Sequence, residues 1–183
     1  MKARMYNKTV WELIKYNGGP INGTQHVMNI NVQVTQDYSL VSLVTMIAPS
    51  PDWFTGIMQM DLCDSSTGMW RDSWNVTMLH PWDAGTDDGN TFNASDTPTN
   101  PQDFISIITK SSDTPFKNVP QANIATLGTL MFQRIYKPAM PTCTGEQKYK
   151  VKIETLWRPE THPNGFPAGA HFSPFVVATH TFK

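Results

Sequence analysis

Alternating apolar and polar positions recur along the chain. Residues 26–36 place apolar side chains at every second position against Asn and Gln, and residues 149–157 alternate in the same way against Lys and Glu. A period of two predicts half-buried antiparallel strands. Further strands are predicted at 57–62, 74–79, 104–108, 126–135 and 175–182, with Pro, Gly and Asn clusters between them. So many short strands predict an all-β, two-sheet antiparallel sandwich.

Residues 40–47 form a nearly continuous apolar run that ends at Pro49-Ser50-Pro51. Such a run is typical of a strand covered on both faces, and the prolines end it abruptly. One helix is also expected. It begins at Thr9, which forms a capping box with Glu12, and it ends before Gly18.

Length and composition indicate one domain over residues 1–183. The chain has 39% hydrophobic residues, 16% charged residues and a net charge of −1. These values give no electrostatic reason to expect nucleic acid or an anionic membrane as a partner. No apolar stretch reaches the roughly eighteen residues of a transmembrane segment. The usual motifs of metalloproteases, serine hydrolases and nucleotide-binding enzymes are absent from the sequence, so we expect no catalysis.

Two acidic loops carry the candidate chemistry. Asp52 follows the apolar strand, and Asp83, Asp87 and Asp88 lie in a long, glycine-containing polar loop. Several carboxylates brought to one point would suit calcium, which takes six to eight oxygen ligands. Alternatively, Asp52 caps a turn and the other three form Asx-turns. The spacing does not fit an EF-hand, because Asp88 stands at the glycine position and no Glu closes the loop.

Three motifs resemble the spondin domain, the amino-terminal domain of F-spondin and mindin. They are PSPDWF at 49–54, DLC at 61–63 and DAGTD at 83–87, and segments 97–102 and 126–136 also look like later strands of that domain. The resemblance implies a C2-like, calcium-binding β-sandwich of extracellular proteins. It also implies that Asp52, Asp83 and Asp87 are the calcium ligands.

The two cysteines, Cys63 and Cys143, are open to two interpretations from the residues alone, because sequence cannot place their Cα atoms: two buried thiols or one disulfide bond. The family resemblance implies the disulfide.

The order of the segments departs from the family. Residues 149–180 resemble the opening of a spondin domain, yet here they come last, and residues 9–16 look like the helix that would follow them. We therefore expect a circularly permuted domain, with central and carboxy-terminal family segments at 1–142 and the amino-terminal family segment at 143–183. A window cut from a tandem array of such domains would also explain this order.

Glycosylation and histidine chemistry complete the candidate sites. Sequons stand at Asn7, Asn22, Asn75 and Asn93, which suits a secreted glycoprotein. The evenly spaced His162, His171 and His180 could suggest zinc, but spacing by nine does not make ligands converge, so packing explains them better.

These observations favour an extracellular, calcium-binding recognition or adhesion module that engages a protein or glycan. The alternative is a structural subunit that self-associates head to tail, exchanging the strand at 149–157. A third hypothesis is a peripheral lipid binder that docks through its calcium loops.

Overall fold

The computed structural model describes residues 9–16, 27–76, 78–117, 126–135 and 142–181. Within these residues the chain forms strands and no helix, as an all-β fold requires. The strands are β1 Val10–Tyr16, β2 Val27–Thr35, β3 Leu40–Ala48, β4 Phe54–Asp61, β5 Cys63–Asp64, β6 Met69–Trp70, β7 Ser73–Val76, β8 Pro81–Asp83, β9 Ser106–Ile107, β10 Gly128–Arg134, β11 Glu146–Thr155, β12 His171–Phe172 and β13 Phe175–His180.

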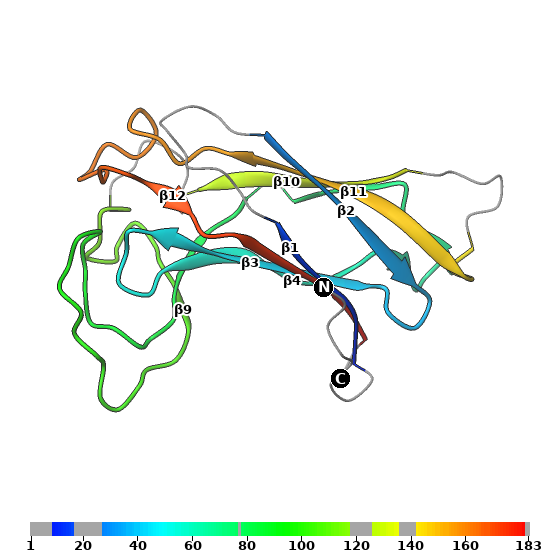
Figure 1. Ribbon diagram of the computed structural model, residues 1–183, viewed down its shortest axis with the longest axis horizontal. Helices are drawn as coiled ribbons and strands as arrows, with labels where there is room; N and C mark the ends of the chain where they lie inside the picture. Colours follow the sequence, from blue (N-terminus) through cyan, green and yellow to red (C-terminus); the bar gives the residue numbers. More distant parts are fainter. Residues whose placement is uncertain (1–8, 17–26, 77, 118–125, 136–141, 182–183) are drawn as a thin grey trace.

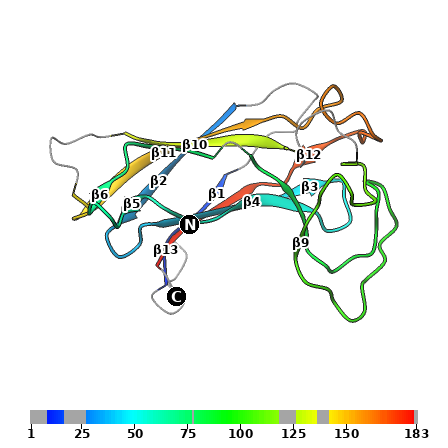
Figure 2. The same cartoon turned by 180° about the vertical axis from the view of Figure 1, so that it is seen from behind.

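Two antiparallel sheets lie face to face (Figure 1). One has seven strands in the order β1-β13-β3-β4-β8-β9, with β12 paired to β3. The other has the order β2-β11-β10-β7, and β5 and β6 form a small hairpin. Seen from behind, the same two layers are visible (Figure 2). The predicted antiparallel β-sandwich is confirmed.

The strand β11 is one of the two inner strands of the smaller sheet, and every second residue along its ten residues is buried. It pairs with β2 and β10 at once, so that Val151 lies between Ile30 and Phe132. All three side chains are at most 3% exposed. The period-two pattern thus supplies one face of the core, as predicted.

In the larger sheet, β3 departs from the prediction that both its faces are covered. Leu43 and Ile47 are buried, whereas Val44 and Met46 are 43% and 50% exposed. The reason is that this antiparallel sheet packs on the core with one face only. Opposite Ser42 the partner strand β4 carries a bulge, where Gln59 takes a positive φ and donates its backbone N–H to the Ser42 hydroxyl.

The predicted helix at Thr9 is wrong. Residues 10–16 form β1, which pairs with β13 so that Leu13 faces Ala178. Instead of capping its own first turn, Glu12 accepts a 3.1 Å hydrogen bond from the backbone N–H of Gln33 in β2. A helix cap at Thr9 would contribute about 1 kcal/mol, and the backbone hydrogen bonds between β1 and β13 outweigh it.

The carboxy-terminal segment is part of both sheets. β11 belongs to the smaller sheet, and β12 and β13 belong to the larger one. The backbone N–H of Thr181 donates to the carbonyl of Thr9, so the outer ends of β13 and β1 are hydrogen-bonded to each other.

Candidate functional site

The two acidic loops meet at one end of the sandwich. Asp52 lies between β3 and β4, and the long loop follows β8 (Figure 1). The Asp52 Oδ2 atom accepts hydrogen bonds from the Thr86 backbone N–H at 2.7 Å, the Thr86 hydroxyl at 2.8 Å and the Asp87 backbone N–H at 3.1 Å. One carboxylate oxygen therefore ties the first loop to the second.

The carboxylates of the long loop accept local hydrogen bonds. Asp83 Oδ1 accepts from the Gly85 N–H at 2.7 Å, and Asp87 Oδ1 accepts from the Gly89 N–H at 2.8 Å, which is Asx-turn geometry. Asp88 Oδ1 accepts from the Thr99 hydroxyl at 2.6 Å. In the part of the chain that the structure describes, no three acidic, His or Cys side chains are already arranged around one point as metal ligands. Each aspartate of the long loop is thus held by its own local hydrogen bond, and Asp52 is joined to that loop through the Thr86 and Asp87 amides.

Burial and neighbouring carboxylates raise the pKa of one aspartate in the long loop. Burial, followed by repulsion from Asp52 and Asp103, raises the pKa of Asp83, and the hydrogen bond from the Gly85 amide partly offsets the rise. In contrast, hydrogen bonds from the Thr97 and Gly89 amides lower the pKa of Asp87.

The exposed Asp96 shares a hydrogen bond with Asp87 and is repelled by its charge, which raises the pKa of Asp96. The neighbouring carboxyls of Asp87 and Asp96 therefore have pKa shifts in opposite directions.

Within the described residues, one carboxylate oxygen of Asp52 has no hydrogen-bond partner. The residue is only 9% exposed, and no donor in the described part of the chain reaches its buried Oδ1 atom. A buried, unsatisfied carboxylate oxygen is costly unless a donor or a cation compensates it. The oxygens at this end come from carboxylates, and no described Lys, Arg or His forms an ion pair with Asp52, Asp83 or Asp87. Such oxygens fit a hard cation.

The backbone of the long loop is held close to the 101–105 segment. Gly85 has a φ of +72°, and a Cβ atom there would lie 2.5 Å from the Asp103 carbonyl oxygen. The Asp103 backbone N–H donates to the Gly85 carbonyl at 2.9 Å. Only glycine allows this turn and this close approach together.

A buried aromatic side chain anchors the long polar loop, and sequence reasoning missed it. Phe92 is 4% exposed, and its ring centroid lies 5.5 Å from that of Trp53 and 5.6 Å from those of Phe116 and Trp157. Trp53 directly follows Asp52, so this cluster holds both acidic loops against the core. The one feature of the sequence that could have indicated this anchor is that Phe92 is a lone aromatic residue in the polar segment 83–102.

Next to the same loops, two apolar side chains point into solvent. Phe104 is 92% exposed and Ile105 is 62% exposed, and both directly follow Asp103. The strand predicted at 104–108 is therefore wrong at its first two positions and at its last, and it is limited to Ser106–Ile107.

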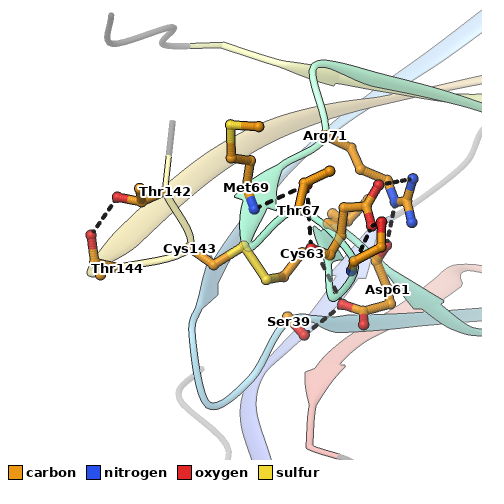
Figure 3. Close-up of a disulfide and its surroundings, with 12 residues drawn as sticks. Ser39, Asp61, Cys63, Thr67, Met69, Arg71, Thr142, Cys143 and Thr144 are labelled. Carbon is orange, nitrogen blue, oxygen red and sulfur yellow. Dashed lines mark hydrogen bonds and ion pairs between the residues drawn. A yellow bond between two sulfur atoms is a disulfide. The ribbon is translucent and has the colours of Figure 1, made fainter. Parts of the chain in front are cut away.

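The disulfide bond that the family resemblance implies is present. Cys63 and Cys143 are joined, with Cα atoms 5.8 Å apart (Figure 3). Asp61 of the DLC motif positions Cys63, because its Oδ1 atom accepts hydrogen bonds from the Cys63 N–H at 3.0 Å and the Ser39 hydroxyl at 2.7 Å.

The three histidines lie in separate environments. His162 is 1% exposed, packs edge-on against Phe116, and burial lowers its pKa to about 4. His180 contacts the Ser42 hydroxyl through Nε2, and the exposed His171 contacts a neighbouring carbonyl. As a packing role predicts, they do not converge on one point.

Of the four sequons, Asn75 and Asn93 are described and both are exposed, whereas Asn7 and Asn22 lie outside the described residues. Glycosylation of any of them stays a prediction.

Comparison with known proteins places this arrangement in a family. Residues 1–124 match the family described as Spondin_N. The chain belongs to the Spondin_N family. The motifs 49–54, 61–63 and 83–87 lie inside the match, so Cys63 and the two acidic loops belong to the matched part of the chain, whereas Cys143 lies beyond it.

Named relatives agree with the assignment. Human spondin-2 is 47% identical over 81 residues, which are 44% of this chain and 24% of that protein. Chicken spondin-1 is 38% identical over 98 residues, which are 52% of this chain and 12% of that protein. The chain thus spans a quarter or less of the curated relatives it matches. No described segment is a helix long and apolar enough to cross a bilayer.

Proposed function

We propose that this protein is a non-catalytic, extracellular recognition or adhesion module of the spondin type, in which Asp52, Asp83 and Asp87 hold a calcium ion. The observation that carries the proposal is the buried Oδ1 atom of Asp52, to which no described group donates. It lies in the same acidic cluster as Asp83, whose ionised form is disfavoured by burial and by the Asp52 charge.

A calcium ion would compensate both features. Calcium binds carboxylate and carbonyl oxygens at about 2.3–2.6 Å and tolerates irregular geometry. The three hydrogen bonds to Oδ2 fix the Asp52 carboxylate and leave Oδ1 for the cation. The ion would stiffen the loop end for a partner and would supply no chemistry of its own.

Thermal unfolding tests this proposal. We expect calcium to raise the Tm of the unaltered protein, because a ligand at 100 times its Kd stabilises the folded state by about 2.7 kcal/mol. Asp83→Asn should remove the calcium response and raise the Tm in chelator, since it removes the repulsion with Asp52. Asp88→Asn, an exposed aspartate in the same loop, is the matched control and should keep the response. Equal melting with calcium and with chelator would contradict the proposal.

Secretion is supported by the Cys63–Cys143 disulfide, since such bonds persist in oxidising compartments. The exposed sequons at Asn75 and Asn93 suit the same path. Removal of N-linked glycans from the secreted protein should lower its mass, and an unchanged mass would remove the glycoprotein assignment.

We also propose that the segment order is permuted relative to the family. The support is that β13 and β1 pair antiparallel and that Thr181 is hydrogen-bonded to Thr9, so residues 182–183 and 1–8 would connect the two strands as the loop of a hairpin. A chain with residues 143–183 placed before 1–142 should fold and melt within a few degrees of the original. A cut inside β11, between Lys150 and Val151, is the control that should prevent folding.

The head-to-tail polymer finds no support. Residues 149–157 largely fall in β11, which pairs with β2 and β10 of the same chain.

One observation favours peripheral lipid binding as a second candidate. Phe104 and Ile105 form an exposed apolar tip beside the acidic loops. Sedimentation with phosphatidylcholine vesicles should then require calcium and be lost in Phe104→Ser. Calcium-independent or absent sedimentation would reject this candidate.

A further inference from the structure

The outer face of the smaller sheet carries a row of lysines. Lys148, Lys150 and Lys152 occupy alternate positions of β11, and their neighbours Tyr149 and Val151 are fully buried. Residues two apart on a strand point to the same side and lie roughly 7 Å from each other. The three lysines therefore share the side of β11 that faces away from the core. In Figure 1, β11 lies in the upper layer, and it is one of the two inner strands of its sheet.

Amide side chains flank this row on both sides. The strand register places Lys150 between Asn31 of β2 and Gln133 of β10, and it places Lys148 beside Gln33. Directly opposite residues share a face of an antiparallel sheet, so these amides surround the lysines. Each amide can both donate and accept hydrogen bonds. We call Asn31, Gln33, Gln133 and the three lysines the lysine face.

The charges of this face are partly balanced at its ends. Glu154 lies 3.7 Å from the Lys152 ammonium, and Glu146 accepts a hydrogen bond from Gln33. Among the described residues, no carboxylate pairs with Lys148 or Lys150. The uncompensated positive charge therefore lies at these two positions, although the whole chain carries a net charge of −1.

We propose that the lysine face binds an extended polyanionic glycan, with sulfate groups on the lysines and sugar hydroxyls on the amides. The face is open and follows a straight strand, which suits a linear chain of regularly spaced anions. The outward positions of β2, β11, β10 and β7 hold no aromatic side chain, so a single-stranded nucleic acid would find no surface for base stacking. The proposal deepens the recognition role above, but the face lies on the opposite sheet from the acidic loops and does not need calcium.

Binding to immobilised heparin, as a sulfated glycan, tests the proposal. All samples carry Asn75→Gln, because Asn75 lies at the edge of the same face and a carbohydrate there would cover it. The test variant is K148Q/K150Q, and K148R/K150R keeps the charge. The matched control is K15Q/K117Q, which removes two exposed lysines elsewhere with the same change in net charge. Melting curves confirm that each variant folds.

The proposal predicts about 10-fold or greater loss of heparin affinity in the K148Q/K150Q variant, and a change below about 2-fold in the control and arginine variants. Binding should weaken as salt rises, with a smaller salt slope in the test variant because fewer counterions are released. Chelator should leave heparin binding unchanged, so a failed calcium site and a failed glycan site are distinguishable. No retention of the parent protein at low salt, equal losses in both glutamine variants, or tighter binding to duplex DNA or phosphatidylserine vesicles than to heparin would each overturn the proposal.

Discussion

Asp52 should stabilise the loop end even without calcium. Its carboxylate is 9% exposed and accepts three hydrogen bonds through one oxygen. A hydrogen bond to a charged group contributes about 1.5–3 kcal/mol. Thr86 supplies two of the three donors and is exposed, so water can replace part of the loss. Asp52→Ala should therefore lower the free energy of unfolding by about 2–4 kcal/mol in calcium-free buffer.

Asp52→Asn separates the hydrogen bonds from the charge. The amide keeps one acceptor oxygen for the Thr86 and Asp87 donors, so the loss should be smaller, about 1–2 kcal/mol. The same variant should lose the calcium response, because it has no second carboxylate oxygen. The free energy of unfolding without calcium therefore reports on the hydrogen bonds to Asp52 Oδ2, and the response to calcium reports on Oδ1.

Urea unfolding in chelator, followed by tryptophan fluorescence, measures both variants. The slope of free energy against urea should be unchanged, since the surface exposed on unfolding is the same. Asp88→Ala controls for charge in the same loop and should cost less than about 1 kcal/mol. If Asp52→Ala were as stable as the unaltered protein in chelator, the inferred bonds between the loops would be wrong.

Three further predictions concern the framework. Replacing Cys63 and Cys143 with Ala should cost about 4–5 kcal/mol, the chain-entropy value for a separation of 80 residues, and guanidinium unfolding that matches the oxidised protein would reject it. Phe92→Ala should cost about 3–5 kcal/mol, whereas Phe104→Ala should stay within about 0.5 kcal/mol, and equal effects in urea would contradict the anchoring role of Phe92. Because burial lowers the pKa of His162 from 6.5 to about 4, its contribution is complete above pH 6.5 and is lost as pH falls toward 4, at about 1.4 kcal/mol per unit and up to about 3 kcal/mol in all. His162→Gln should flatten that part of the pH–stability curve, and an unchanged curve would show that His162 is not the responsible group.

The sequence predicted the strands whose burial repeats every second residue. β2 and β11 are clear examples, because each has one face in the core and one in solvent. The pattern at residues 10–16 also alternates, but the capping box at Thr9 favoured a helix. Residues 10–16 form a strand because they pair with β13, which lies about 165 residues away in the chain. A local signal could not contain that contact.

Some features of the candidate site could likewise be predicted from the sequence, and others could not. The motifs around Asp52 and Asp83 predicted that two acidic loops belong together, and Asp52 does join them through Thr86. The unsatisfied Oδ1 atom and the burial of Phe92 could not be predicted, because both depend on packing between distant segments. The lysines of β11 were visible as the polar half of an alternating strand, but their amide neighbours depend on the sheet register.

Calorimetric titration with calcium tests the central claim most directly. The account predicts one binding site per chain in the unaltered protein, retained in Asp88→Asn and absent in Asp83→Asn. A titration with no heat of binding, repeated at a second temperature to exclude a cancelling enthalpy, would contradict a calcium site formed by Asp52, Asp83 and Asp87.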